Sequence, residues 1–175
     1  MSELPAAIEP ETKSWTWVLE ATCPDCGFDA RSFDVGAIGA ALDDNARRWE
    51  AVLARPDART RPAPTVWSAL EYGCHVRDVF RIFDGRLQQM LADDDARFAN
   101  WDQDATAVED RYDRQDPAAV ARDLRANADA LAATYGGVSD WTRTGARSDG
   151  ATFTIESFTR YLLHDPLHHL WDVAG

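Results

Sequence analysis

The segment from Ser68 to Asp93 constrains the fold most, because its apolar residues can share one core only if it forms a long helix. These residues recur every three or four positions and form one continuous stripe on a helix of 3.6 residues per turn. They are Tyr72, Val76, Val79, Phe83, Leu87 and Met90. Ser68 and Glu71 have the spacing of a capping box, which predicts where the helix begins. A helix with one apolar stripe needs other elements against which to pack.

Three further segments show the same periodicity and predict three more helices. The first runs from about Val35 to Arg55, the next from about Pro117 to Tyr135, and the last starts after Thr154 and continues into the histidine-rich end. Four amphipathic helices without alternating strands predict an all-α protein, with the architecture of a four-helix bundle. We expect this bundle to span residues 35–175 as one domain, after an N-terminal extension at residues 1–34 that contains a CxxC turn.

Three connecting stretches interrupt these helices. Residues 14–30 predict a short strand that leads into a tight turn at CPDCG. Residues 98–116 form a long acidic connection, and connections of that length in compact domains are often functional. Residues 141–154 predict a small hairpin before the last helix, with its turn near Ser148, Asp149 and Gly150.

The charge balance limits the classes of partner. The 175-residue chain has 18 basic residues against 30 acidic ones and a net charge of −12, so it would repel a phosphate backbone. The sequence has no apolar run of about 18 residues and no signal-peptide pattern at its start. Three cysteines argue against a secreted disulfide framework. We therefore expect a cytoplasmic protein with a small-molecule substrate and no nucleic-acid or membrane partner, while homodimer formation stays open.

Three of the four histidines lie in YLLHDPLHHL, residues 161–170, and the fourth is His75. His75 falls in the apolar arc of its helix, where a histidine is either hydrogen-bonded or a metal ligand. His164 and His168 are four residues apart, so their rings share one helix face with Cβ atoms about 6 Å apart. Together with His75 they predict three corners of a tetrahedral metal site, whose fourth corner takes water or substrate.

Pro166 leaves the geometry of this cluster open. It lacks a backbone N–H, so it either kinks the helix or lies at the start of a new one capped by Asp165. A helical wheel places His169 on the apolar side, which makes His169 an alternative ligand to His168. Asp172, four residues beyond His168, and Asp165 are candidates for orienting the ligands from outside the metal site.

The stretches WSALEYGCHVRDVF and YLLHDPLHHLWDV resemble the DinB/YfiT superfamily, over roughly residues 35–173. Members of that superfamily are four-helix bundles with a three-histidine metal site, and the resemblance places the ligands at His75, His164 and His168. Members with known activity include thiol S-transferases and maleylpyruvate isomerases, which use low-molecular-weight thiols such as mycothiol or bacillithiol. The resemblance therefore implies a divalent metal ion and a thiol cosubstrate.

The cysteines and Arg86 are further candidates. Cys23 and Cys26 form half of a zinc site that needs two more ligands, and Cys74 is the remaining cysteine. For the role of Cys23 and Cys26, we favour a structural turn with free thiols over a disulfide or a zinc half-site, and we favour a catalytic role least. Arg86 is expected to pair with an acidic residue of the 98–116 connection, or to receive a carboxylate or thiol cosubstrate. Trp101 in that connection is a candidate cover for the pocket mouth.

The leading hypothesis is a metalloenzyme. Zn²⁺, with Ni²⁺ or Fe²⁺ as alternatives that also suit imidazole, would lower the pKa of a bound thiol or water for attack on an electrophilic small molecule. One alternative is a non-catalytic bundle that holds a structural ion or none and binds a protein partner. Another is a metal-dependent hydrolase in which water replaces the thiol. The sequence shows no obvious protein nucleophile or general base, so the catalytic residues stay unassigned.

Overall fold

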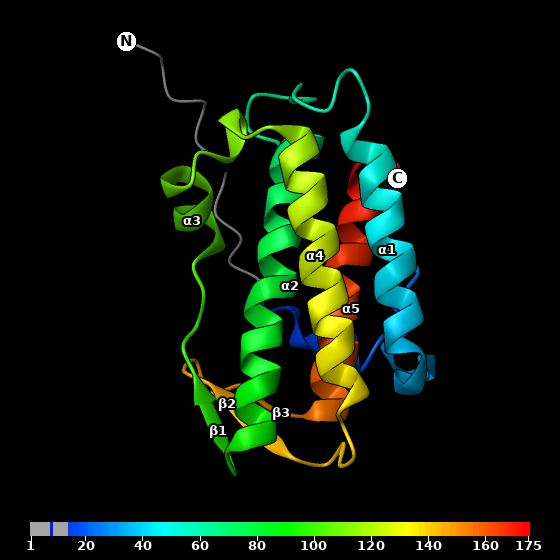
Figure 1. The fold of residues 1–175 in the computed structure, drawn as a ribbon, viewed down its shortest axis with the longest axis vertical. Helices are drawn as coiled ribbons and strands as arrows, with labels where there is room; N and C mark the ends of the chain where they lie inside the picture. The colour runs from blue at the N-terminus through cyan, green and yellow to red at the C-terminus, as the bar shows by residue number, and fades with distance from the viewer. Residues whose placement is uncertain (1–7, 9–13) are drawn as a thin grey trace.

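The computed structural model describes residue 8 and residues 14–175 of the chain. Four long helices pack side by side: α1 (Ile38–Leu53), α2 (Ala69–Ala92), α4 (Pro117–Gly136) and α5 (Ile155–Asp172) (Figure 1). Around the bundle α1 contacts α4, α4 contacts α2, α2 contacts α5, and α5 contacts α1. Burial of large apolar side chains from all four helices is the main force that holds them together. These side chains include Trp49, Phe80, Leu124 and Phe158.

Local signals in the sequence set where these helices begin. Ser68 caps α2 by accepting a hydrogen bond from the backbone of Glu71, and the Glu71 carboxylate accepts one from the Ser68 N–H at 2.8 Å. Asp116 caps α4, and Pro117 occupies its first turn. The four helices predicted from periodicity are confirmed to within a few residues. The first of them begins as a 3₁₀ turn, Val35–Ala37, which leads into α1.

A three-stranded sheet beside the bundle corrects the expectation of a purely all-α fold. β2 (Thr144–Arg147) and β3 (Thr152–Thr154) pair antiparallel, which confirms the predicted hairpin. β1 (Ala96–Phe98) pairs with β2 in parallel, and a strand of three residues is too short to show a period in the sequence. The connection between α2 and α4 also contains a short helix, α3 (Gln103–Glu109). The sheet lies at one end of the bundle, and α3 lies beside α2 toward the other end (Figure 1).

The N-terminal segment, residues 14–34, lies against α5. It forms 3₁₀ turns at Trp15–Leu19 and Ala30–Ser32, so the prediction of a strand there is wrong. The predicted tight turn is confirmed, because the Gly27 N–H donates to the Cys23 carbonyl at 2.9 Å and Gly27 has a φ of +75°, which favours glycine. Residues 1–7 and 9–13, which hold the start of the chain where no basic leader is predicted, lie outside the described residues.

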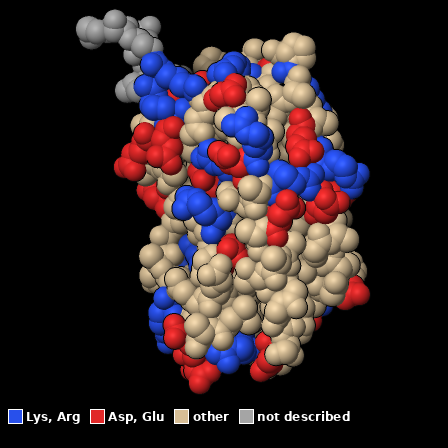
Figure 2. Space-filling model, viewed as in Figure 1, with Lys and Arg blue, Asp and Glu red and all other residues tan. Residues whose placement is uncertain are grey.

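Charged groups on one face of the bundle alternate in sign. Figure 2 shows acidic and basic side chains interspersed on this face, which includes α1 and α4. Arg125 of α4, for example, forms ion pairs with Asp43 and Glu50 of α1. This face therefore lacks the continuous basic surface to which a phosphate backbone binds. Within the described part of the chain, no helix has both the length and the apolar composition to cross a bilayer.

Two candidate metal-binding groups on helix α5

The histidine-rich segment forms one continuous helix. Pro166 lies inside α5, which runs without a break from Ile155 to Asp172, so the alternative of a new helix starting at Pro166 is wrong. Pro166 has no N–H to donate within the helix, but its carbonyl accepts a hydrogen bond from Asn45 Nδ2 of α1 at 3.0 Å. Because the helix continues, residues 164 and 168 stay on one face, and residues 165 and 169 on the next.

The first group, called here the four-donor group, contains Cys23 and Cys26 of the N-terminal segment with His164 and His168 of α5. One ligand atom from each residue lies within 4.8 Å of the others. Cys23 Sγ is 3.6 Å from His168 Nδ1. Cys23, His164 and His168 are all buried, and His164 Nε2 has no hydrogen-bonding partner among the described residues. Two thiols and two imidazoles are the donors of a common type of zinc site.

The second group, called the three-donor group, contains His75 of α2 with Asp165 and His169 of α5. Their ligand atoms also lie within 4.8 Å of one another. The Asp165 carboxylate lies 3.2 Å from His75 Nε2 and 3.8 Å from His169 Nε2. His75 is fully buried, whereas the Asp165 side chain is 34% exposed. Two imidazoles and one carboxylate suit zinc or iron(II) and leave coordination positions open.

The three histidines predicted to share one metal ion thus fall into two candidate groups, and the ligand set of His75, His164 and His168 stays a prediction. His75 joins His169, while His164 and His168 join the cysteines. The physical reason is the turn of about 100° per residue, which directs neighbouring side chains of α5 toward different partners. Asp165, expected to orient a ligand, lies among the candidate ligands themselves. Two features of the sequence could have indicated these two groups of donors: the spacing of Asp165 and His169, and the CxxC half-site.

Asp172 lies between the two groups. Its Oδ2 accepts a hydrogen bond from His169 Nδ1 at 2.7 Å, and its Oδ1 is 3.9 Å from His168 Nε2. In a neutral His169 this contact favours the proton on Nδ1, which would leave Nε2 available to a bound cation. The sequence predicted that Asp172 would orient His168, but its closer contact is with His169.

Aromatic rings fix the histidines of both groups. The Trp101 ring stacks on His75 with centroids 5.3 Å apart and planes 6° apart, and Trp67 lies at 5.6 Å. Trp101 thus covers a candidate ligand, although the sequence suggested only that it covers the pocket mouth. In the four-donor group, Trp15 lies 5.3 Å from His164 and 5.2 Å from His168. Such contacts restrict ring rotation and keep water away from the ligands.

The local environment sets the protonation of several donors. Burial, assisted by the neighbouring His168, lowers the pKa of His164 to about 4, so this ring is neutral at pH 7 and able to bind a cation. Burial opposes ionisation of Asp165, but His75 and His169 outweigh it and hold the pKa of this carboxyl below its usual range. Burial raises the pKa of the Cys26 thiol to about 11, which makes it a poor nucleophile without a bound cation.

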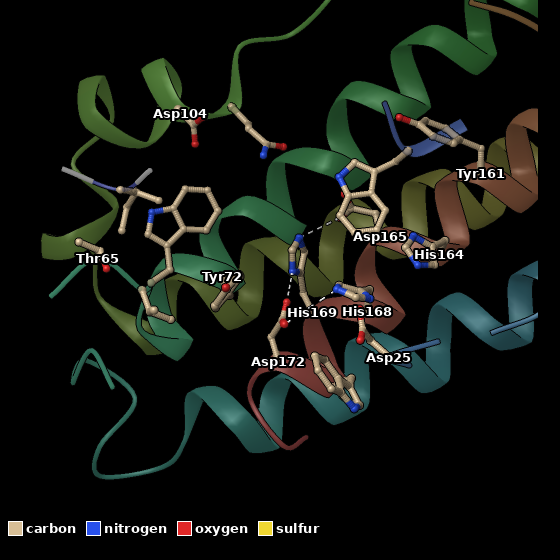
Figure 3. Close-up of a pocket in the computed structure, with 16 residues that line it drawn as sticks. Asp25, Thr65, Tyr72, Asp104, Tyr161, His164, Asp165, His168, His169 and Asp172 are labelled. Atoms are coloured by element: carbon tan, nitrogen blue, oxygen red, sulfur yellow. Dashed lines mark hydrogen bonds and ion pairs between the residues drawn. The ribbon is translucent and has the colours of Figure 1, made fainter. Parts of the chain in front are cut away.

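A cavity of about 420 Å³ opens beside both groups (Figure 3). Four aspartates contribute to its wall, and the described residues of the wall include no lysine or arginine. The remaining wall is mostly aromatic and histidine side chains. The aspartates are Asp25, Asp104, Asp165 and Asp172. Figure 3 shows Asp104 of α3 across the cavity from Asp165, His168 and His169 of α5. A cavity of this charge attracts cationic ligands, repels anionic ones and does not exclude neutral ones.

Arg86 and Cys74 are buried elsewhere. Arg86 donates to the Ala99 carbonyl at 2.9 Å and faces the rings of Phe83 and Phe98, instead of pairing with the acidic residues of the 98–116 connection. Burial lowers the pKa of Arg86 to about 10, and it is not among the described residues of the cavity wall. Cys74 Sγ lies 3.9 Å from a backbone carbonyl and belongs to neither group of donors.

Comparisons with known proteins agree with this fold. The model of the DinB superfamily matches residues 41–173, a range that contains most of α1 and all of α2 to α5 but excludes Cys23 and Cys26. The structure of YfiT from Bacillus subtilis, described as a probable metal-dependent hydrolase with an unusual four-helix bundle topology, aligns with a TM-score of 0.70. The alignment has 14% sequence identity and covers 80% of this chain and 85% of that chain, so the likeness shows the fold alone. No curated protein matches the chain significantly. Because the family model spans most of the sequence, this chain belongs to the DinB superfamily.

Proposed function

We propose that the protein is a metal-dependent enzyme that acts on a small neutral or cationic molecule, with its metal ion held by His75, Asp165 and His169. One observation carries this proposal: three donor atoms from two helices lie within 4.8 Å of one another, and two of the three residues line the cavity. Catalytic zinc sites commonly have three protein ligands and keep a further position for water or substrate. The donor set therefore fits a catalytic ion better than a closed structural one.

A divalent ion in this group would act as a Lewis acid and lower the pKa of a water or thiol that binds in its open position. The donors carry a single formal negative charge, that of Asp165, so most of the charge of the ion would remain available for this effect. The description of YfiT as a metal-dependent hydrolase supports the water alternative by analogy of fold.

The residues of the chain prepare this group for metal binding. Asp172 favours one tautomer and one orientation of the His169 ring. Trp101 and Trp67 hold the His75 ring in place. Tyr72 lies 4.8 Å from the His169 ring, and burial, with Asp172 and Glu71 nearby, raises the pKa of Tyr72 to about 12. The Tyr72 hydroxyl therefore stays protonated at pH 7 and is able to donate a hydrogen bond.

The charge of the cavity selects the substrate class. With four aspartates and no basic residue in the described wall, the cavity disfavours carboxylate and phosphate substrates. The same argument weighs against a strongly anionic cosubstrate such as bacillithiol. A neutral or cationic ester or amide fits the acidic, aromatic wall, since cations bind favourably both to carboxylates and to aromatic faces.

The test combines metal analysis with an activity panel, on protein purified without an affinity tag. The panel contains neutral, cationic and anionic nitrophenyl esters, together with 1-chloro-2,4-dinitrobenzene in the presence of mycothiol or bacillithiol. We expect chelator-sensitive hydrolysis of the neutral or cationic esters, and His75→Ala should abolish it together with one bound ion. Thiol conjugation without hydrolysis would instead identify a transferase.

The adjacent buried residue provides the control. Cys74→Ala also shortens a buried side chain of α2 but leaves both donor groups intact. It should retain metal and activity, and circular dichroism should show that both variants keep their helices. If His75→Ala retains full metal content and activity, the three-donor group is not the active site. If no assay responds to metal, a non-catalytic bundle is the better description.

A further inference from the structure

We infer that Cys23, Cys26, His164 and His168 bind a second metal ion, a structural zinc that fastens the N-terminal segment to α5. This inference does not depend on the enzymatic proposal, because it uses a different set of donors. The two cysteines lie outside residues 41–173, which the superfamily model matches, so the site joins an additional segment to the shared bundle.

The donor distances suit a tetrahedral zinc ion. Zinc binds thiolate sulfur at about 2.3 Å and imidazole nitrogen at about 2.0 Å, which places the sulfur and nitrogen about 3.5 Å apart at a tetrahedral angle. Cys23 Sγ and His168 Nδ1 are 3.6 Å apart. All four donor atoms lie within 4.8 Å of one another, so small side-chain rotations would complete the site. Two thiolates would also neutralise the charge of Zn²⁺.

A buried nitrogen without a partner points to the same ligand. His164 is 4% exposed, and its Nε2 has no hydrogen bond within the described part of the chain. A buried polar atom without a partner costs free energy, and a bound cation would remove that cost. Trp15 and Phe28 lie 5.3 Å and 6.2 Å from the His164 ring, and they form the apolar surroundings that keep water from a metal ion.

The position of Cys23 argues against a catalytic thiol at the proposed active site. Cys23 is 1% exposed, and neither cysteine is among the described residues of the 420 Å³ cavity wall; Cys26 lines a separate cavity of about 490 Å³. A substrate at the proposed active site would therefore not reach the Cys23 sulfur, despite the adjacent His168. Two histidines converge on the two sulfurs, an arrangement that a simple disulfide would not require but a zinc ion would.

The N-terminal segment has a modest apolar attachment to the bundle. Val18, Cys23 and Ala30 are buried, and Leu19, Phe28 and Phe33 are partly buried against the core. Small units of this kind commonly depend on a metal or disulfide. A zinc ion would connect residues as far as 145 positions apart in the sequence, Cys23 and His168. It would thereby hold Trp15 and Asp25 in place as part of the cavity wall.

Cobalt(II) provides a direct test, because thiolate ligands give bound cobalt a charge-transfer absorption in the near ultraviolet. Protein without an affinity tag is stripped of metal, titrated with cobalt(II) and then with zinc. We expect a thiolate-to-cobalt band that reaches its maximum with one cobalt per chain in this site, and zinc should displace it. Wild-type protein is sufficient for this measurement, so the result does not depend on whether a variant folds.

Variants then assign the band and the bound zinc. Cys23→Ser combined with Cys26→Ser should remove the band and one equivalent of zinc, whereas Cys74→Ser should leave both unchanged. His75→Ala should also leave the thiolate band unchanged, which separates this site from the proposed catalytic one. A missing band in reduced wild-type protein, or unchanged zinc content in the double serine variant, would overturn the inference. Loss of the band in Cys74→Ser would do so as well.

Discussion

The two donor groups lie on adjacent faces of one helix, yet they differ in what surrounds them. The four-donor group has two thiols from the N-terminal segment, and these thiols lie away from the cavity. The three-donor group has one carboxylate and no thiol. The α5 residues of both groups line the cavity, so the groups differ in their number of donors and in the two cysteines, not in which part of α5 faces the cavity. A complete set of four protein ligands favours a structural ion, and an incomplete set favours catalysis. The elements that face α5, rather than its histidines alone, therefore determine the two roles.

The strongest test of this difference is Asp165→Asn, which removes a charge from the three-donor group without changing its size. Loss of the carboxylate should release the ion and lower kcat/KM about 1000-fold, or about 4 kcal/mol in the activation barrier. The measurement is kcat/KM on the substrate that the ester panel identifies, together with metal content. The thermal midpoint should fall as well, because the ionised carboxylate favoured by His75 and His169, and the ion bound with it, are both lost, so circular dichroism must show that the variant stays folded.

Asp94→Asn is the matched control for that variant. It removes the same charge from a side chain that is 96% exposed and pairs with Arg143, away from both donor groups. Activity and metal content should both stay at the wild-type level. If Asp165→Asn retains activity, the three-donor group is not the catalytic site, and the proposed difference between the two groups is wrong in that respect.

The second prediction concerns the stability of the N-terminal segment. Replacing Cys23 and Cys26 by serine should increase amide hydrogen exchange in residues 14–34 by at least about 100-fold, because the segment would open without its ion. The Gly27 N–H, which donates to the Cys23 carbonyl, is the most direct reporter. Amides of α2 and α4 should keep their protection. A uniform increase throughout the bundle would show that the four-donor group stabilises the whole fold instead.

The bundle itself could be predicted from the sequence because its determinants are local. The stripe from Tyr72 to Met90 and the capping box at Ser68 and Glu71 contain enough information to place a helix. The pairing of β1 with β2 could not be predicted this way, since it joins residues 96 and 145 and depends on the path of the chain between them. Short strands held by distant partners leave little periodic signal.

The site could be predicted only in part, for a related reason. The periodicity of α5 identifies which residues share a face, but it does not identify the element that the face contacts. His164 and His168 fall in one candidate group with the cysteines of the N-terminal segment, which packs against α5, whereas His75 falls in the other group. Whether the three histidines share an ion stays a prediction. The CxxC half-site lacked two ligands, and the pair His164 and His168 also lacked ligands. The sequence alone does not show that these two pairs lie together, because their proximity depends on the fold.

A smaller effect is expected from Asp172→Asn, which tests how the two groups are connected. The variant weakens the hydrogen bond that orients His169, so metal affinity of the three-donor group should fall about 10- to 100-fold. The four-donor group should be less affected, since Asp172 is 3.9 Å from His168 but 2.7 Å from His169. Competition with a chromophoric chelator measures both affinities. Equal losses at both groups would indicate that Asp172 couples them strongly.

The smallest effect concerns the acid stability of the bundle, which must be separated from metal loss because acid also protonates metal ligands. Asp78 of α2 is buried, and burial opposes its ionisation. Hydrogen bonds from Arg77 and Tyr112, with the charge of Arg81, outweigh burial and hold the pKa of Asp78 below its ordinary value. The ionised carboxylate therefore stabilises the folded protein above the unfolded-state pKa of about 3.9, and this contribution is lost as the pH falls through the lower folded-state pKa.

Asp78→Asn should accordingly cost about 1.5 kcal/mol in the free energy of unfolding at pH 7, because Tyr112 and Arg77 lose a charged acceptor. Urea unfolding at pH 7, 5 and 3 measures wild type and variant together. The difference between them should be constant down to about pH 4 and shrink below it. Metal loss in acid affects both proteins equally and therefore cancels from the difference in their unfolding free energies. If that difference stays constant down to pH 3, the acid sensitivity of the protein arises from the donor groups of α5 and not from Asp78.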